Sequence, residues 1–306
     1  MDDLTSISVV MPIKNREHHV VHAIASIFRQ SHPVREIIIV NDGSTDGTRA
    51  VLDQMASENP IVRPVHLEVS GGAAAARNIG IAHATSAWVA FLDSDDAWAP
   101  EKLERQLALA RRDPATVGVF TGIRYVETIG EAGGPVYDYA PKVEITLETL
   151  RQLNHLSSTS TALVRRDALL AVGGFDKTLP SCQDWDLWLQ LAERGRLALL
   201  PDPLTSCSFG NSDRISRNFK SVIAGHQIVF DKIYRADPRP SAVRLNRSYH
   251  KARLAQIYLL DLENPLIGLK YAASSLFEQP TAFGWSLFRD AALGVARAAR
   301  RRLLPR

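Results

Sequence analysis

Apolar and polar positions alternate in blocks along the first 125 residues, as they do where strands and helices follow one another. Short apolar runs rich in β-branched residues predict buried strands at 7–11, 36–40, 61–67, 88–92 and 116–125. Apolar residues three or four positions apart predict helices at 15–31, 48–57, 73–84 and 100–111. Strands separated by helices of this length imply an α/β fold with a mostly parallel sheet and helices on both faces.

The pattern changes after this region, where glycines and prolines predict a long loop at 127–143. Three further elements are predicted behind it: a strand at 159–164, a helix at 183–192 and a strand at 197–200. From about Asn218 onward the pattern is almost entirely helical. We therefore predict a mixed α/β domain over 1–217 and a helical C-terminal region over 218–306.

The composition is that of an ordinary globular protein, with 306 residues of which 45% are hydrophobic and 23% charged. Two cysteines cannot build a disulfide framework, which favours a reducing compartment. The acidic N-terminus lacks the layout of a signal peptide, and no apolar run approaches the roughly 20 residues that span a bilayer. We expect a cytoplasmic protein, soluble or peripheral on the inner face of the plasma membrane.

The net charge of +3 conceals a basic C-terminus, because residues 289–306 carry six arginines and one aspartate. One stripe of the final predicted helix holds the apolar residues Trp285, Phe288, Ala292, Val295, Ala299 and Leu303. Arginines on the other side make this layout typical of a helix on an anionic membrane surface. Leu287 and Leu293 interrupt the stripe, so packing against the α/β domain is the alternative. No nucleic-acid partner is expected, because no aromatic residues are interleaved with the arginines.

Acidic residues follow two of the predicted strands directly. Asp42 comes after the strand at 36–40, and Asp93, Asp95 and Asp96 come after the strand at 88–92. Ligands of doubly wound sheets bind at the carboxyl ends of the strands, and three neighbouring acids repel one another unless a cation neutralises them. If the strand continues, Asp93 and Asp95 project to one side and suit Mg²⁺ or Mn²⁺. Capping of the next helix is the alternative role.

A second acidic site lies at the predicted helix 183–192. Asp184 falls at the amino end of this helix, where the helix dipole favours an ionised carboxylate. Capping of the helix is again the alternative. Trp185 and Trp188 belong either to the core, which we favour, or to a surface on which a sugar stacks.

Several short motifs follow one another along the chain: SVVMPIKNR at 8–16, EIIIVNDGS at 36–44, ARNIG at 76–80, FLDSDD at 91–96, GFD at 174–176 and DWDLW at 184–188. Their order and spacing resemble the family 2 glycosyltransferases of the GT-A fold. The resemblance covers roughly residues 6–217. It implies inverting transfer of a sugar from a nucleotide-diphosphate donor, of UDP or dTDP type, with Mn²⁺ or Mg²⁺ as cofactor. The implied acceptor is a saccharide or a lipid-linked glycan.

The resemblance also implies roles for individual residues, carried over by position. Asp42 resembles the acid that hydrogen-bonds the nucleobase, and Arg77 an arginine near the donor nucleotide. Asp93 resembles the first acid of the Asp-x-Asp motif, near ribose and metal, and Asp95 the metal ligand proper. Asp184 resembles the catalytic base, which would deprotonate the acceptor hydroxyl.

Further candidate residues are expected on the donor side and on the acceptor side of the site. Pro12 is a donor-side candidate at the end of the first strand, and Trp185 and Asp186 are acceptor-side candidates. Residues 213–216 resemble a flexible segment that folds over the donor, where Arg214 would meet the diphosphate. An ordinary surface loop is the alternative for that segment.

Two positions depart from the pattern of the family. Lys14 stands where the family often has an aromatic residue, so it would reach a phosphate or a neighbouring acid instead of stacking on the base. The usual Glu-Asp pair is here Gln183-Asp184, which removes one negative charge beside the base.

Three hypotheses for the function differ in class. The first is a non-processive glycosyltransferase of cell-surface polysaccharide synthesis, since the processive signature Gln-x-x-Arg-Trp is absent. The second is a metal-dependent sugar nucleotidyltransferase, which would need a basic glycine-rich loop near the first strand in place of Pro12 to Asn15. The third is a non-catalytic nucleotide-sugar-binding protein, against which the intact Asp93, Asp95 and Asp184 argue.

Overall fold

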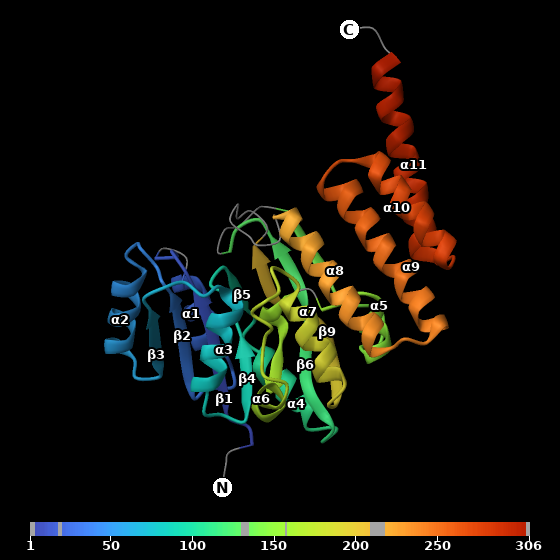
Figure 1. Ribbon diagram of the computed structural model, residues 1–306. Coiled ribbons are helices and arrows are strands. Elements are labelled where there is room, and N and C mark those ends of the chain that lie inside the picture. Colours follow the sequence, from blue (N-terminus) through green and yellow to red (C-terminus); the bar gives the residue numbers. More distant parts are fainter. Residues whose placement is uncertain (1–3, 18–19, 130–134, 157, 209–217, 304–306) are drawn as a thin grey trace. The chain divides into compact units, whose positions relative to one another are not determined.

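The alternating blocks of the sequence fold into a mixed sheet flanked by helices, followed by a group of helices (Figure 1). The computed structural model describes residues 4–17, 20–129, 135–156, 158–208 and 218–303. The chain divides into two compact units. The sheet unit comprises Met1–Leu147, His155–Thr178 and Gln183–Ser212. The helical unit comprises Glu148–Asn154, Leu179–Cys182 and Asp213–Arg306.

In the described part of the chain the sheet has nine strands. They are β1 Ile7–Ile13, β2 Glu36–Asp42, β3 Val62–Leu67, β4 Trp88–Phe91, β5 Asp96–Trp98, β6 Thr116–Val126, β7 Val136–Tyr139, β8 Leu163–Arg165 and β9 Arg196–Ser208. Their order is β3-β2-β1-β4-β8-β6-β9-β5, with β7 paired to β6. β3, β2, β1 and β4 are parallel, whereas β8 runs antiparallel to both of its neighbours.

Helices cover both faces of this sheet. The helices of the sheet unit are α1 Val20–Phe28, α2 Thr48–Glu58, α3 Ala73–His83, α4 Lys102–Ala110, α6 Arg166–Ala171 and α7 Gln183–Ala192, whereas α5 Leu147–Gln152 belongs mostly to the helical unit. Alternate residues of β1 face opposite layers: Val9 shares a core with Ile24 of α1, and Val10 lies against Gly80 of α3. A Cβ on Gly80 would come within 2.3 Å of Val10, so only glycine lets α3 approach this closely. The predicted fold class is confirmed.

The structure differs from the predicted elements at places where a side-chain hydrogen bond or a strand from a distant part of the chain determines the backbone conformation. The predicted loop at 127–143 contains β7, which pairs with β6. The predicted strand at 159–164 is a 3₁₀ turn, Thr159–Thr161, followed by β8, because the Ser158 side chain accepts a hydrogen bond from the Ser160 amide. The helix predicted at 15–31 is described over Val20–Phe28, and Asn15, with its φ of 51°, lies outside the helix.

The helical unit is built from long helices in sequence order. They are α8 Phe219–Ala236, α9 Pro240–Gln256, α10 Pro265–Glu278 and α11 Ala282–Leu303. The last three pack against one another through the small and apolar residues Ala252, Ala255, Ala272 and Leu287 (Figure 1). The predicted domain limits, 1–217 and 218–306, did not anticipate the segments 148–154 and 179–182 of this unit, and they stay a prediction.

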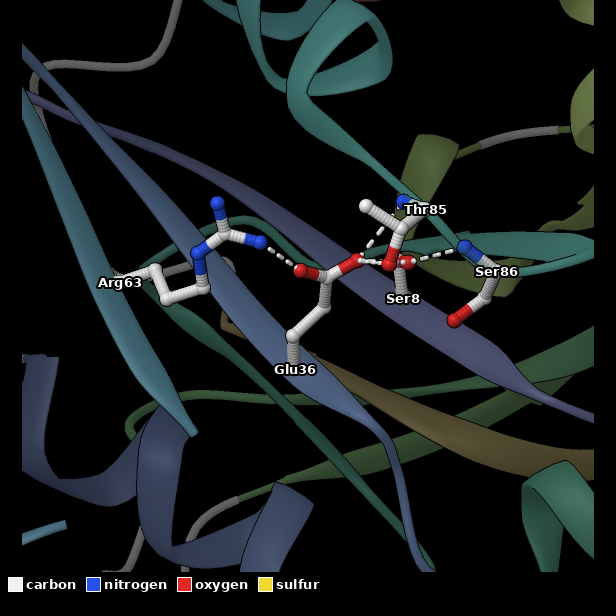
Figure 2. A network of polar contacts seen from close by, with 5 residues as sticks. All are labelled: Ser8, Glu36, Arg63, Thr85 and Ser86. Carbon is white, nitrogen blue, oxygen red and sulfur yellow. Dashed lines mark hydrogen bonds and ion pairs between the residues drawn. The ribbon is translucent and has the colours of Figure 1, made fainter. Parts of the chain in front are cut away.

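A buried carboxylate ties the amino ends of three strands together (Figure 2). Glu36, 3% exposed at the start of β2, accepts hydrogen bonds from Ser8 of β1 and from the amide and hydroxyl of Thr85, and it pairs with Arg63 of β3. Ser8 in turn accepts from the Ser86 amide at 3.1 Å. Burial by itself would raise the pKa of Glu36, but the hydrogen bonds from Ser8, Thr85 and Arg63 lower it below the ordinary value.

Replacing Glu36 by glutamine should destabilise the sheet unit, because an amide cannot accept all of these hydrogen bonds and would leave buried donors unsatisfied. We expect a loss of about 1–3 kcal/mol in the free energy of unfolding, measured in urea. Glu68→Gln, in an exposed pair with Arg49, is the control and should change it by less than about 0.5 kcal/mol. Equal losses in both variants would contradict the role given to Glu36.

Two buried histidines stabilise the helical unit in their neutral form. His250 is 1% exposed; its Nε2 donates to the Arg151 carbonyl at 2.8 Å, its Nδ1 accepts from the Tyr234 hydroxyl at 2.7 Å, and its ring stacks on Phe230. Burial lowers the pKa of His250 to about 3. Burial, opposed in part by a hydrogen bond to the backbone, lowers the pKa of His226 to about 4.

The free energy of unfolding should therefore fall as the pH is lowered below about 6.5. In that range the unfolded chain binds protons that the folded chain excludes, down to about pH 3 for His250 and about pH 4 for His226. The expected slope is up to about 1.4 kcal/mol per pH unit for each histidine. Urea unfolding between pH 7.5 and 5 measures it. His250→Gln should flatten the slope, and the exposed His22→Gln should not.

Candidate active site

The carboxyl ends of three parallel neighbours, β2, β1 and β4, meet at one edge of the sheet. Pro12 and Lys14 lie at the end of β1, Asp42 is the last residue of β2, and Asp93 and Asp95 follow β4. The topology therefore brings the ends of the strands that carry most of the predicted donor-side residues to the same edge.

Asp42 holds the loop that leads into α3. The carboxylate is 4% exposed and accepts hydrogen bonds from the Ser70 hydroxyl at 2.7 Å and from the amides of Gly71 and Gly72 at 2.7 and 3.0 Å. Gly72 has a φ of 85°, which glycine adopts without strain. A carboxylate offers about four acceptor sites. Any nucleobase that Asp42 binds must therefore share it with this loop.

The loops after β1 and β2 are interlocked. The Asn15 amide donates to the Ser44 hydroxyl at 2.9 Å, and the Asn15 side chain accepts from the Thr45 amide at 2.8 Å. Lys14 sits directly before this junction and is exposed. The second predicted basic residue of the donor side, Arg214, lies outside the described residues and stays a prediction.

The chain after β4 forms a tight turn, Asp93–Asp96, which we call the acid turn. β4 ends at Phe91, the Asp96 amide donates to the Asp93 carbonyl at 3.1 Å, and β5 then runs antiparallel to β9. The expectation that strand geometry continues through Asp93 and Asp95 is therefore wrong, because the chain reverses to reach β9. The acid turn does not cap the next helix either, since α4 begins at Lys102 after Glu101.

Asp93 is clamped from two sides. Arg77 of α3, 8% exposed, donates to one carboxylate oxygen at 2.6 Å, and the Thr159 hydroxyl donates to the other at 3.2 Å. The Asp93 amide donates to the Ser160 hydroxyl at 3.0 Å. We call Ser158–Thr161 the hydroxyl turn. The hydroxyl turn was not predicted from the sequence, although its run of serines and threonines before a buried strand is a signal for side-chain hydrogen bonding.

The acid turn offers hard oxygen donors of the kind that Mg²⁺ and Mn²⁺ prefer. Asp93 and Asp95 are both partly exposed. Among the described residues, no three histidine, cysteine, aspartate or glutamate side chains converge as a metal site. The two carboxylates of the acid turn suit a cation that takes its other ligands from water and phosphate oxygens, as Mg²⁺ usually does. A metal that takes Asp93 must share this carboxylate with Arg77 or Thr159.

The glycine-rich loop before α7 is pinned to the same helix as the clamp. Asn78, next to Arg77, donates to the Phe175 carbonyl at 2.8 Å and accepts from the Phe175 amide at 2.7 Å. The Phe175 ring packs edge-on against Phe91 at 5.4 Å, and the Arg77 guanidinium lies 5.5 Å from its centre. A Cβ on Gly174 would come within 2.4 Å of Asn78. The ARN motif therefore serves both the acid turn and this loop.

Asp184 is the second residue of α7 and is partly exposed. Trp185, at 1% exposed, and Trp188 lie in the core, which the sequence favoured for both. Asp186 is buried and accepts from the Gln190 side chain at 2.9 Å. The burial of Trp185 and Asp186 argues against a direct contact of either with an acceptor, while the role of Asp184 stays a prediction.

Comparisons with known proteins place this geometry in a family. The model of glycosyl transferase family 2 matches residues 8–173, more than half of the chain. A Bacillus subtilis relative, TuaG, named for a glycosyltransferase of teichuronic acid biosynthesis, is 33% identical over 191 residues, 62% of this chain and 73% of TuaG. The Escherichia coli glucosyltransferase WfgD is 35% identical over 109 residues, 36% of this chain and 42% of WfgD.

Solved structures show the same fold at low sequence identity. Staphylococcus aureus TarS 1–349 in complex with UDP-GlcNAc has a TM-score of 0.66 and 18% identity, covering 97% of this chain and 92% of the other. The Pyrobaculum calidifontis mannosyltransferase PcManGT, in complex with GDP-Man and Mn²⁺, has a TM-score of 0.55 and 18% identity, covering 96% of this chain and 88% of the other. The GT-A fold expected from the motifs is confirmed, and the chain is a glycosyltransferase that belongs to glycosyl transferase family 2.

Proposed function

We propose that this glycosyltransferase moves a single sugar from a nucleotide-diphosphate donor, of UDP or dTDP type, to a hydroxyl of a saccharide or lipid-linked glycan in cell-surface polysaccharide synthesis. The observation that carries the proposal is the clamped Asp93 at the carboxyl ends of parallel strands. The printed names of the relatives support it. TuaG is named for teichuronic acid biosynthesis, and WfgD for transfer from UDP-Glc to a GlcNAc-diphosphoundecaprenol.

Residues at the carboxyl ends of β1, β2 and β4 bind the donor. Asp42 orders the loop of Ser70, Gly71 and Gly72 and offers its remaining acceptor capacity to the nucleobase. Lys14, exposed beside the interlocked loops, reaches toward phosphate, and Arg214 meets the diphosphate. These positive charges favour a donor that carries two phosphates.

The acid turn would hold the metal. Asp95, together with Asp93 steadied by Arg77 and Thr159, supplies carboxylate oxygens to Mn²⁺ or Mg²⁺. When bound, this cation offsets the negative charge that grows on the departing diphosphate. Arg77 keeps Asp93 in one orientation before the donor arrives, which reduces the reorganisation needed on binding.

Asp184 is the proposed general base. Its carboxylate removes the proton of the acceptor hydroxyl while that oxygen attacks the anomeric carbon from the face opposite the leaving diphosphate. One bond to carbon forms as the bond to the diphosphate breaks, so the configuration at that carbon inverts. Its position at the start of α7 favours the ionised carboxylate that a base requires. Gln183 leaves Asp184 without the acidic neighbour that the family often has.

The predicted stripe of α11 is only partly exposed in the helical unit. Phe288 packs against the cluster that contains Leu287, while Trp285 is exposed, so the stripe stays a prediction. No helix in the described ranges is long and apolar enough to cross a bilayer.

Four exposed apolar residues of the helical unit lie together at the corner between α9 and α10. This apolar corner consists of Leu260, Leu262, Leu266 and Ile267. α11 passes it closely, since a Cβ on Gly294 would lie 3.1 Å from Pro265. The turns of α11 beyond Gly294 contain Arg297, Arg300, Arg301 and Arg302. We propose that leucines and arginines together rest on anionic lipid at the inner face of the plasma membrane, near a lipid-linked acceptor.

Substitution of the proposed acids should separate their roles. Asp184→Asn should lower sugar transfer by a factor of about 10²–10⁴ while binding of the nucleotide persists, because only the base is lost. Asp95→Asn should weaken binding of Mn²⁺. Purified protein with a panel of nucleotide sugars and Mn²⁺, read by release of the nucleotide, measures transfer, and calorimetry measures binding.

Asp167→Asn, in an exposed pair with Arg165, is the control for these substitutions and should behave as the wild type. Transfer that is unchanged in Asp184→Asn would rule out its role as base. Equal rates with and without excess EDTA would rule out the metal.

Flotation with vesicles of phosphatidylcholine and phosphatidylglycerol tests the apolar corner. The double substitution Leu260→Ser with Leu266→Ser should lower the partition constant at least about tenfold, because two exposed leucines no longer enter the interface. Phe277→Ser is the matched control, since Phe277 is 93% exposed at the opposite end of α10. An equal loss in the control, or no binding of the wild type, would refute this surface.

A further inference from the structure

A lysine side chain is fully buried inside the sheet unit, where a charged amine is unfavourable. Lys102, the first residue of α4, is 0% exposed, and burial lowers its pKa well below the ordinary value. Among the described residues no carboxylate pairs with it. Its Nζ donates to the Gln106 side chain at 2.9 Å and lies 4.3 Å from the centre of the Trp98 ring. Burying an amine costs free energy, and the contacts with Gln106 and Trp98 offset part of that cost.

Both partners of Lys102 reach the hydroxyl turn. The Gln106 amide group is buried and donates to the Val119 carbonyl at 2.7 Å and to the Thr161 carbonyl at 2.9 Å. The Trp98 indole donates to the Ser160 carbonyl at 2.8 Å. Two consecutive carbonyls of the hydroxyl turn are thus fixed from behind by side chains that Lys102 contacts.

Two hydrogen bonds connect the hydroxyl turn to Asp93 of the acid turn. The hydroxyl of Ser160 accepts from the Asp93 amide at 3.0 Å, and the hydroxyl of Thr159 donates to the Asp93 carboxylate at 3.2 Å. Each link is a hydrogen bond between groups that are wholly or partly buried. In such surroundings an unmade hydrogen bond is expensive, so the network favours one arrangement over others.

We infer that Lys102, Gln106 and Trp98 are positioning residues of the donor site, which hold the hydroxyl turn and through it the main chain and carboxylate of Asp93. They touch neither donor nor acceptor and act only through Ser160 and Thr159. The consequence for activity rests on the proposed function, because it requires Asp93 to serve the donor and the metal. The placement of Asp93 itself can be tested without any activity.

The chain provides a matched control in the same core. Gln30 is also a buried glutamine; it donates to the Ala99 and Ser26 carbonyls at 2.8 and 3.2 Å and accepts from the Leu103 amide at 3.1 Å. Gln106 likewise donates to two carbonyls and accepts from one donor. Methionine at either position therefore removes the same number of buried hydrogen bonds, but only Gln106 touches the hydroxyl turn.

Three variants, Lys102→Met, Gln106→Met and Gln30→Met, are compared by hydrogen exchange with mass spectrometry and by the Tm. Peptides over residues 92–96 and 158–162 should exchange faster in the first two variants and at the wild-type rate in Gln30→Met. All three should lose Tm. Faster exchange of these peptides in Gln30→Met, or no change in Gln106→Met, would overturn the inference.

Titration of Mn²⁺ in the presence of UDP, followed by electron paramagnetic resonance, then tests the consequence. Lys102→Met and Gln106→Met should weaken Mn²⁺ binding about tenfold or more, as losses behind a metal ligand usually do, and Gln30→Met should not. Equal affinities in Gln106→Met and Gln30→Met would refute the link to the donor site. A wild-type protein that binds no Mn²⁺ would instead refute the proposed metal, and hydrogen exchange would still decide the placement of Asp93.

Discussion

The arrangement of the site depends on how the charge of Asp93 is compensated. Three acids lie within four residues after β4, and such a group is stable only if cations or donors surround it. Arg77, which is 8% exposed, meets the partly exposed Asp93 at 2.6 Å, so solvent and salt screen this pair less than a pair on the open surface. The same guanidinium lies over Phe175, and the neighbouring Asn78 holds its backbone. One turn of α3 thus orders both the acid turn and the loop that leads to α7.

The secondary structure was predictable for segments whose own sequence pattern determines whether they form a strand or a helix. The runs behind β1, β2 and β4 have apolar residues at consecutive positions, and a strand buried on both faces accommodates them. β5 and β7 carry no such pattern. β5 forms because β9 offers it an edge, and β7 because β6 extends beyond the core. Such strands depend on a partner that lies far along the chain, which local periodicity cannot report.

The residues of the candidate site likewise fall into those that the sequence predicted and those that it did not. Motifs placed Asp42, Asp93 and Asp95 at strand ends, because the motif residues and the strands are adjacent in sequence. Thr159 and Lys102 were missed for a different reason. Thr159 lies 66 residues from Asp93, the acid it contacts, and Lys102 looks like any charged residue at the start of a helix. Only the packing of α4 against β6 and β9 shows that this lysine is inside.

The two ends of β2 carry equally buried carboxylates, and the number of hydrogen bonds that each accepts distinguishes the one that holds structure from the one that can serve a ligand. Glu36 accepts from three side chains and one amide, so its capacity as an acceptor is used up within the sheet. Asp42 accepts from three donors of a single loop, which leaves about one acceptor site. A nucleobase that donates to Asp42 would complete this set without displacing a donor. The loop at Asp42 is therefore ordered before a nucleobase binds, and binding would use only the acceptor site that remains.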